Sequence, residues 1–395
     1  MLGVFSAVQE AAKAELALSD TQLGLLQGLA VSLPLAALSI PVGIAVDRAN
    51  RVRLLLATSA AWTIGTLLTV WSATLPALFA ARMLAGLGAN ISTTIAISLA
   101  ADLCLPAQRG RTLLLLTVGK YGGTALAFAL GGWLLGHFAI SGGWLGLSPW
   151  RAVHLVLGLG SAVLTLSILA LREPPRLEAE AGQGAPLRVV AAELWARRAF
   201  LAPLFLGQLG VFMADASAGI WAAPVLQRRF GLAPQDFAGW LGALIFASGI
   251  LGALLGGFAG DWALRRGGGR LLLQCAAIAA LAALPAALFP LATSLPAFAA
   301  ALFVMLLGGT VTGLITATAL AVLLPNELRG LCIGSFVAFA GLIAFGAGPT
   351  LVTLASTGLG GEQWLGLALG LVGLAVSALG LAGFVGAMRH APQAI

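Results

Sequence analysis

The chain has 395 residues, of which 60% are hydrophobic and only 9% are charged, and its mean hydropathy is +1.01. These values exclude a soluble globular domain and predict an integral membrane protein. The formal net charge of +7 comes from basic residues spread over short loops, without a basic patch or a nucleic-acid-binding motif, which argues against a nucleic-acid partner.

The amino terminus, MLGVFSAVQEAAKAEL, is predicted to be a short helix. About 15 helical residues give ~22 Å, less than the ~30 Å hydrocarbon layer, so we expect only the outer half of a membrane span here. The segment has neither the basic start nor the cleavage site of a signal peptide, and we do not interpret it as a targeting sequence.

Eleven apolar stretches follow, each near the ~20 residues that a helix needs to cross the hydrocarbon layer. The sequence therefore predicts an all-α membrane protein with eleven full spans and a partial first helix. The spans run from Leu23 to Val46, Leu54 to Trp71, Leu75 to Ala100, Thr112 to Gly136, Trp150 to Leu171, Phe200 to Pro224, Gly239 to Gly260, Leu271 to Leu291, Leu295 to Leu324, Leu331 to Leu354 and Trp364 to Met388.

Lys and Arg residues are distributed unevenly between the two predicted sides of the membrane. Fifteen Arg residues fall on the side that contains the loop after Val46, whereas only Lys13, Arg151, Arg228 and Arg229 fall on the other side. An excess of cations marks the cytoplasmic side of a membrane protein. We predict that the loop after Val46 is cytoplasmic and that this multi-pass protein lies in a bacterial inner (plasma) membrane.

The chain repeats itself at a shift of 214 residues, which aligns GIAVDRANR with GFAGDWALR. The repeat predicts an N-terminal bundle at 1–171 with a partial first helix, a cytoplasmic linker with an amphipathic helix at 172–199, and a C-terminal bundle at 200–395. The residues that the shift pairs within the motif are Gly43 with Gly257, Asp47 with Asp261, and Arg51 with Arg265.

Two segments of the first half of the chain resemble signatures of the major facilitator superfamily of secondary transporters. GIAVDRANRVRLL is similar to the signature between helices 2 and 3, and ARMLAGLG to the helix 4 signature. LALSDTQLGLLQGLA, SPWR and REPPR look most like the spinster-like branch. The resemblance implies two six-helix bundles related by a pseudo-two-fold axis, alternating access and a monomer in the lipid bilayer.

The chain departs from the spinster-like pattern in two places. The Asp-Arg pair of the first helix would precede the first residue, and Asn90 stands where the branch has an acidic residue in helix 4. The second departure argues against a proton site built on a glutamate at that position.

The paired cytoplasmic motifs predict a gate. An Asp is disfavoured at the C-terminus of a helix, so its placement twice at one spacing requires a partner. The resemblance implies that such residues lock the two halves together on the cytoplasmic side; the alternative is a solvated turn. The predicted gate residues are Gly43, Asp47, Arg48, Arg51, Asp102, Arg109, Arg111, Gly257, Asp261 and Arg265.

Three charged residues, Arg82, Lys120 and Asp215, fall inside predicted spans. A charge at a helix centre costs ~2.5 to 3.5 kcal/mol on insertion scales, so such residues usually face a cavity or a partner. They predict a central cavity for an anionic or zwitterionic substrate, in which Asp215 either pairs with a cation or carries a proton. The alternative is that the side chains extend to the membrane interface.

Four further polar residues complete the predicted substrate and coupling site: Asn90, Tyr121, His154 and Gln208. His154 is either a proton carrier or a packed residue. Asn90 and Gln208 either line the cavity or form hydrogen bonds between helices.

We therefore expect a secondary transporter that moves a small organic or amphipathic solute, coupled to protons. No Walker-type phosphate loop supports ATP-driven transport. Scattered His and Cys residues offer neither a catalytic centre nor a metal site, so we expect no enzyme activity, no metal and no cofactor. A membrane-embedded solute-binding sensor is the alternative, although loops of at most about 28 residues leave no room for a signalling domain.

Overall fold

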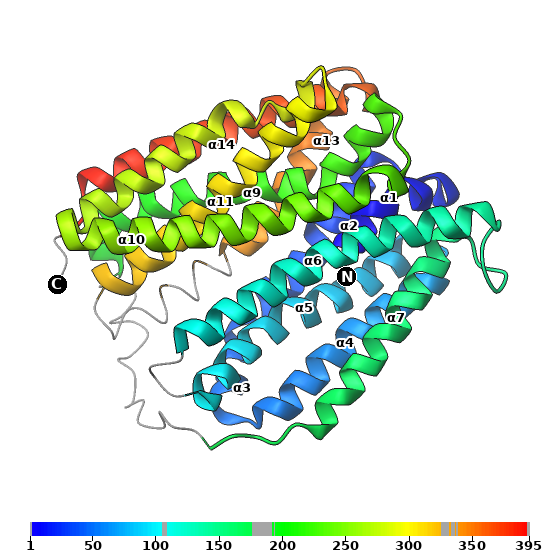
Figure 1. Ribbon diagram of the computed structural model, residues 1–395, viewed down its shortest axis with the longest axis horizontal. Helices are drawn as coiled ribbons and strands as arrows, with labels where there is room; N and C mark the ends of the chain where they lie inside the picture. Colours follow the sequence, from blue (N-terminus) through cyan, green and yellow to red (C-terminus); the bar gives the residue numbers. More distant parts are fainter. Residues whose placement is uncertain are drawn as a thin grey trace. The chain divides into compact units, whose positions relative to one another are not determined.

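The computed structural model of the protein describes residues 2–104, 109–175, 192, 194–324, 332, 336 and 339–392, and the regular elements of this part are helical (Figure 1). Most of the predicted amphipathic linker helix lies outside these residues. So does the loop PNELRG at 325–330.

The first half of the chain forms seven α-helices and a 3₁₀ turn. Their bounds are α1 Leu2–Leu16, α2 Asp20–Gln27, α3 Leu29–Arg48, α4 Arg51–Trp71, α5 Leu75–Leu103, α6 Arg109–Ile140, α7 Pro149–Ser167 and η2 Ile168–Ala170.

The second half begins with the two longest helices of the described chain. Its elements are α9 Arg198–Phe230, α10 Pro234–Ala286, η3 Phe289–Leu291, α11 Leu295–Leu323, the π-helix η4 Gly341–Ala347, α13 Gly348–Gly358, η5 Glu362–Trp364 and α14 Leu365–Arg389.

Ten helices of the described chain are long and apolar enough to cross a membrane. One of them, Pro234–Leu291, covers two of the predicted spans and is broken at Gly268, whose φ of 63° and ψ of −151° are not helical. A positive φ of this kind costs glycine little and other residues more, so the glycine permits the break.

The caps of two helices repeat between the halves. Thr74 accepts a hydrogen bond from the amide of Ala77 at the start of α5, and Ser294 accepts one from Ala297 at the start of α11. Both helices then have proline in their first turn, where its missing N–H costs no helical hydrogen bond. The two helices therefore begin with the same local structure.

Close helix contacts rely on glycine. A Cβ on Gly88 of α5 would lie 2.3 Å from the Thr58 carbonyl oxygen of α4, and a Cβ on Gly383 of α14 would lie 2.3 Å from the Gly207 nitrogen of α9. Membrane helices have little hydrophobic drive to associate, so small residues that let backbones approach increase their packing.

The chain divides into two compact units, Met1–Ala179 with Gly219–Phe246 and Phe345–Thr350, and Glu180–Ala218 with Ala247–Ala344 and Leu351–Ile395. The first unit therefore contains segments of α9 and α10 together with first-half helices. Within it, α6 and α10 approach so closely that a Cβ on Gly242 would lie 2.6 Å from the Ala125 carbonyl oxygen. The predicted domain boundaries stay a prediction.

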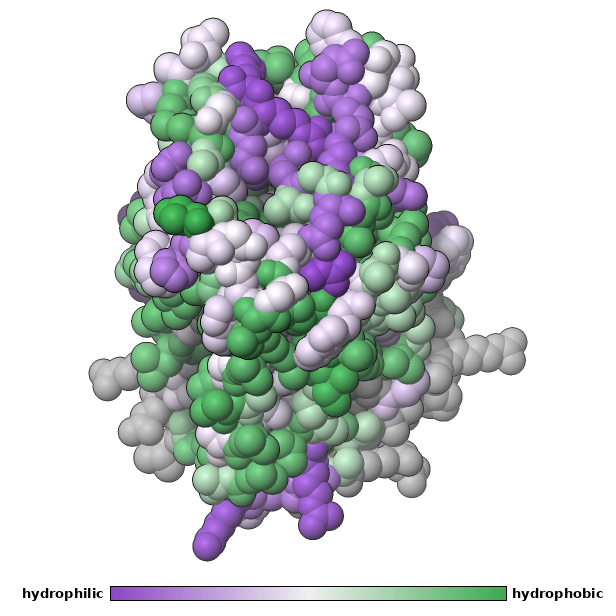
Figure 2. All heavy atoms as spheres, turned by 90° about the vertical axis from the view of Figure 1, so that its right-hand side faces the viewer, coloured by the Kyte–Doolittle hydropathy of each residue, from purple (hydrophilic) through white to green (hydrophobic). Residues whose placement is uncertain are grey.

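Large apolar side chains are exposed along the helices, among them Ile140, Leu164, Leu115 and Phe258, each at least 70% exposed. On the face drawn in Figure 2, hydrophilic residues gather in patches and apolar residues cover the areas between them. Exposed apolar surface of this extent is expected on helices whose sides face lipid. The chain is thus a multi-pass integral membrane protein.

Candidate functional site

Arg82 and His154 both contact one aromatic ring in the first unit. Arg82 of α5 is 4% exposed, and its guanidinium lies 4.7 Å from the centroid of the Phe5 ring of α1. His154 of α7 is also buried and packs edge-on against the same ring, with centroids 5.8 Å apart. The structure thus brings together two predicted site residues through Phe5, which the sequence did not indicate.

Both side chains retain unused hydrogen-bonding atoms. Nε of Arg82 and Nε2 of His154 are shielded from solvent and have no hydrogen-bond partner. The other ring nitrogen of His154, Nδ1, lies 2.9 Å from the Trp150 carbonyl oxygen. Within the described residues, no acidic side chain forms an ion pair with Arg82. A buried guanidinium without an acid is rare, because its desolvation is not offset.

A network of buried polar side chains begins next to Phe5 on α1. Ser6 donates to Oε1 of Gln27 at 2.7 Å, Gln27 donates to Gln9, and Gln9 donates to the Ile220 carbonyl oxygen at 2.7 Å. These residues belong to α1, α2 and the part of α9 in the first unit. The sequence analysis missed them, because single Gln and Ser residues in a short helix carry no pattern of their own.

Lys120 and Tyr121 are neighbours on α6 and contact each other. Lys120 of α6 is exposed, and its Nζ lies 5.5 Å from the centroid of the Tyr121 ring. The side chain of Asn90, on α5, lies outside the described residues.

The second unit contains the other two predicted residues, both on α9. Gln208 is fully buried; its Oε1 accepts a hydrogen bond of 2.9 Å from Thr316 of α11, and its Nε2 has no partner. Asp215 lies seven residues further on, about two turns along the same face. Its Oδ1 is shielded from solvent and also lacks a partner.

Arg228 joins three elements of the first unit in an ion-pair network. Its Nη1 lies 2.6 Å from Oδ2 of Asp20 at the start of α2, and its Nη2 lies 2.7 Å from Oε1 of Glu10 on α1. Lys13 contacts the other Asp20 oxygen at 2.6 Å. Two of the cations assigned to the outer side by charge counting, Lys13 and Arg228, therefore have buried or half-buried acids as partners, which the sequence did not predict.

A second ion pair anchors the same end of α1. Nε of Arg151 lies 2.7 Å from Oε1 of Glu15, and its Nη2 donates to the Ser72 carbonyl oxygen at 2.9 Å. Three helices of the first unit, α1, α4 and α7, are thereby connected at their predicted outer ends.

The first copy of the repeated motif is held by buried contacts. Arg51, at the start of α4, has a side chain that is only 3% exposed and contacts Asp102 of α5 and, at 2.8 Å, Oε1 of Glu173. The other Glu173 oxygen accepts from the Val52 amide at 2.9 Å. Burial alone would raise the pKa of Glu173, but the hydrogen bonds from Arg51 and from the backbone lower it.

The structure therefore places two predicted gate residues, Arg51 and Asp102, against each other and adds Glu173. The side chains of the remaining first-half gate residues lie outside the described part of the chain: Gly43, Asp47, Arg48, Arg109 and Arg111.

The second copy of the motif is open to solvent. Asp261 and Arg265 lie on one face of α10 with side chains that are 71% and 80% exposed, and their closest nitrogen and oxygen atoms are 3.9 Å apart. Gly257 lies one turn before Asp261 on the same helix, where an added Cβ would lie 3.9 Å from Leu314. Among the described residues, this copy of the motif thus forms a surface ion pair.

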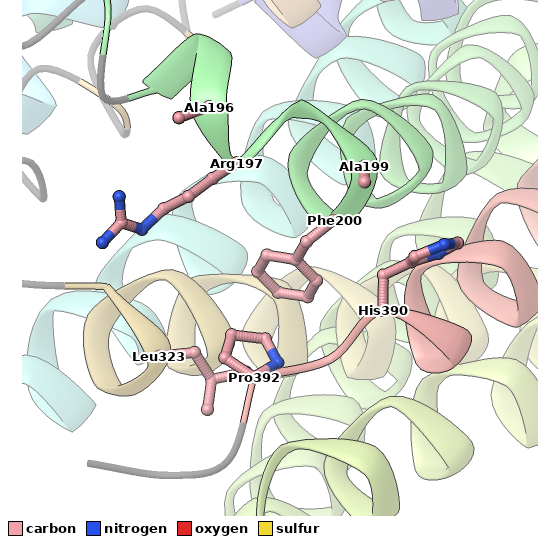
Figure 3. A pocket seen from close by; sticks show the side chains of 7 residues that line it. All are labelled: Ala196, Arg197, Ala199, Phe200, Leu323, His390 and Pro392. Atoms are coloured by element: carbon pink, nitrogen blue, oxygen red, sulfur yellow. The ribbon is translucent and has the colours of Figure 1, made fainter.

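A mostly apolar cavity of about 360 Å³ lies in the second unit, between the start of α9, the end of α11 and the residues after α14 (Figure 3). Phe200 lies at its centre between His390 and Leu323, while the Arg197 side chain extends away from it. Phe200 precedes Asp215 by 15 residues, or ~22 Å of helix. The cavity therefore contains none of the predicted substrate residues. In the described part of the chain, no cluster of His, Cys, Asp and Glu residues is arranged to hold a metal ion.

The family described as Major Facilitator Superfamily matches residues 1–349. The chain is similar to mouse protein spinster homolog 1, with 30% identity over 262 residues that make up 60% of this chain and 47% of the mouse protein. It is also similar to an uncharacterized protein in the puhA-bchM intergenic region of Rhodobacter capsulatus, with 28% identity over 288 residues, 68% of this chain and 56% of that one. The chain thus spans about half the length of the curated relatives it matches.

Among solved structures, a bacterial homologue of the human lysosomal transporter spinster, in an inward-facing and unoccupied conformation, is similar over 99% of this chain and 91% of that chain. The TM-score is 0.76 and the identity 22%, so this likeness shows the fold alone. Together these matches confirm the predicted all-α membrane fold and the resemblance to the spinster-like branch.

Proposed function

Because the chain belongs to the major facilitator superfamily, we propose that it is a secondary transporter that moves an anionic or zwitterionic organic solute by alternating access. The solute is small or amphipathic, protons are the coupling ion, and the protein works as a monomer in a bacterial inner membrane. Nothing in the proposed cycle requires a catalytic residue or a nucleic acid.

The single observation that carries the solute class is the burial of the Arg82 guanidinium without an acidic partner among the described residues. This guanidinium is 4% exposed, has no acidic partner among the described residues, and has an Nε without a hydrogen bond. A buried cation of this kind is stabilised when an anionic group enters beside it, because charge-assisted hydrogen bonds then replace the lost hydration. A carboxylate or phosphate of the solute is the simplest such group.

The aromatic ring that Arg82 and His154 both contact supports the same proposal. Phe5 lies against the guanidinium of the one and the imidazole of the other. A solute that binds here would meet a cation next to an apolar ring, which suits a zwitterionic or anionic molecule with an apolar part.

Alternating access also requires contacts that form and break between the two halves of the chain. Arg228 of α9 contacts Asp20 and Glu10, so a second-half helix is fastened to first-half helices at the predicted outer end. We assign these ion pairs to the closed outer gate.

The proposal is tested with the full-length protein reconstituted into proteoliposomes. Uptake of two radiolabelled probes, lysophosphatidylcholine and succinate, is measured with and without an inward proton gradient. We expect uptake of at least one probe to rise with the gradient. We expect Arg82→Gln to reduce that uptake by about ten- to a hundredfold, the equivalent of one or two charge-assisted hydrogen bonds.

Arg53→Gln is the matched control, because it removes the same charge from an exposed position on α4. Equal losses in the two variants would remove Arg82 from the substrate site. A wild-type protein that binds a probe without moving it would contradict transport and favour a sensor.

A further inference from the structure

Asp215 is the acidic residue that lies deepest in the helices of the second unit. Its Oδ1 has no hydrogen-bond partner and is shielded from solvent, while the residue as a whole is half-buried. It lies 17 residues, or ~25 Å, from the start of α9 at Arg198 and 13 residues, or ~20 Å, from Arg228. No charge on its own helix is near enough to pair with it.

The described helices of the second unit provide no counter-ion either. Neither α11 nor α13 contains a titratable residue, and α14 contains only Arg389, its last residue. The charged residues of α10 in this unit, Asp261, Arg265, Arg266 and Arg270, cluster around the break at Gly268, and its one other titratable residue there is Cys275. Within the described residues, Asp215 thus forms no ion pair.

Residue 309 provides the space that Asp215 occupies. A Cβ on Gly309 of α11 would lie 2.0 Å from Oδ2 and 2.6 Å from Oδ1 of Asp215, distances that no real side chain tolerates. The carboxyl group therefore rests directly on the backbone of α11. The hydroxyl of Thr312, one turn further along α11, donates to the Gly309 carbonyl oxygen at 3.0 Å.

From this arrangement we propose that Asp215 binds the coupling proton and that Gly309 is the positioning residue that admits the carboxyl group; this assignment rests on the proposed transport function. The step is a proton transfer alone: an Asp215 carboxylate oxygen takes a proton from water to form the neutral acid and later returns it to water. No other bond forms or breaks.

A proton fits this position better than a metal cation. Metal cations require several oxygen ligands that converge on one point, and oxygen-only sites for hard cations use about six or more. The described residues of α9 and α11 provide a single carboxyl group, that of Asp215. An unpaired carboxyl group in an apolar environment costs far less when neutral, so the niche on α11 suits the protonated form.

Protonation then changes which conformation is favoured. The neutral acid is compatible with packing on α11, whereas the ionised form favours a state in which water reaches the carboxylate. A ligand shifts a conformational equilibrium by its difference in affinity for the two states, and the proton has such a difference here. This links proton binding to the movement of α9 against α11.

Infrared spectroscopy on the purified full-length protein tests the proton site without any solute. The difference spectrum between acidic and alkaline buffer should contain the carbonyl bands of the protonated carboxylic acids, and Asp215→Asn should remove the component that arises from a carboxylic acid in an apolar environment. A component of this kind that persists unchanged in Asp215→Asn would overturn the assignment, whatever the solute is.

Flux measurements test the coupling and Gly309. Movement of protons driven by the transported probe is followed with a pH-sensitive dye inside proteoliposomes. We expect Asp215→Asn to exchange the probe but to move no protons, and Gly309→Ala to shift the pH at which proton movement is half-maximal. Gly313→Ala, one turn away on α11, is the matched control, because its added Cβ meets no atom closer than 3.8 Å.

The outcomes separate the two proposals. If the wild-type protein moves no probe, the transport function fails while the infrared band still tests the proton site. If Asp215→Asn moves protons with the wild-type pH dependence, or if both glycine variants behave alike, the assignment is wrong although transport stands.

Discussion

The two copies of the repeated cytoplasmic motif share residue types and spacing but differ in what surrounds their arginines. The Arg51 side chain is 3% exposed and contacts the carboxylates of Asp102 and Glu173. The Arg265 side chain is 80% exposed, and its ion pair is with Asp261 at 3.9 Å. The difference originates outside the motif, because α5 contains an acid near its end whereas α11 contains no titratable residue.

This comparison shows what a repeated charge pattern predicts and what it does not. The spacing locates two equivalent turns at helix ends, but the acids that approach each turn decide how strongly its arginine is held. Removing one partner of a buried ion pair costs several kcal/mol, whereas an exposed pair contributes about 0 to 1 kcal/mol. We therefore infer that the first copy is a structural clamp within its unit and that the second copy is free to find another partner during transport.

The largest expected effect is that of Arg51→Ala. The substitution leaves Asp102 and Glu173 without their shared cation, so we expect the free energy of unfolding to fall by about 3 kcal/mol. Thermal unfolding of the purified protein in detergent measures the change. Arg53→Ala, an exposed neighbour on α4, should leave the unfolding temperature nearly unchanged; comparable losses in both variants would argue against a clamp.

Arg228→Ala extends the comparison to the predicted outer end. Arg228 resembles Arg51 in having two acidic partners, of which Asp20 is 3% exposed, but its own side chain is 26% exposed. We expect a loss of about 2 kcal/mol, between the values for a buried and a surface pair. The same thermal measurement checks this loss of stability. A loss smaller than that of Arg265→Ala would show that burial of the acids does not determine the strength of the ion pair.

The pH dependence of the clamp follows from Glu173. Its pKa is lower in the folded protein, so its contribution to stability is complete above the ordinary glutamate pKa of ~4.3 and is lost as the pH falls below that value. Unfolding temperatures measured between pH 7 and pH 3 should fall less in Glu173→Gln than in the wild-type protein. Parallel curves for the two proteins would contradict this role.

Arg265→Ala should have the smallest effect. An exposed pair at 3.9 Å contributes little, and we expect a change of less than ~0.5 kcal/mol. If the second copy nevertheless acts as a gate, the same variant should reduce the transport rate at unchanged unfolding temperature. A large loss of stability would show that Arg265 has a structural partner after all.

The sequence was sufficient for the fold class. Composition and span length predicted the helices, and the motif at 43–51 led to the family. Charges inside spans singled out Arg82 and Asp215, because an apolar helix makes any charge conspicuous.

Partnerships across the fold could not be predicted in the same way. Phe5, Glu173 and Arg228 are separated in the sequence from the residues they contact, and each is an ordinary residue in its own segment. Spacing alone also gave no reason for Lys120 to stay exposed while Arg82 is buried. The role of Gly309 depends on a contact between α9 and α11 that no local pattern encodes.

Counterflow tests the central claim, that this protein carries a solute across the membrane, most directly. Proteoliposomes are loaded with unlabelled lysophosphatidylcholine or succinate and diluted into the labelled compound without any proton gradient. Alternating access predicts a transient accumulation of label that depends on the unlabelled compound inside and is reduced about tenfold or more by Arg82→Gln. Saturable binding of the label to the protein, with no accumulation inside the vesicles, would contradict the account.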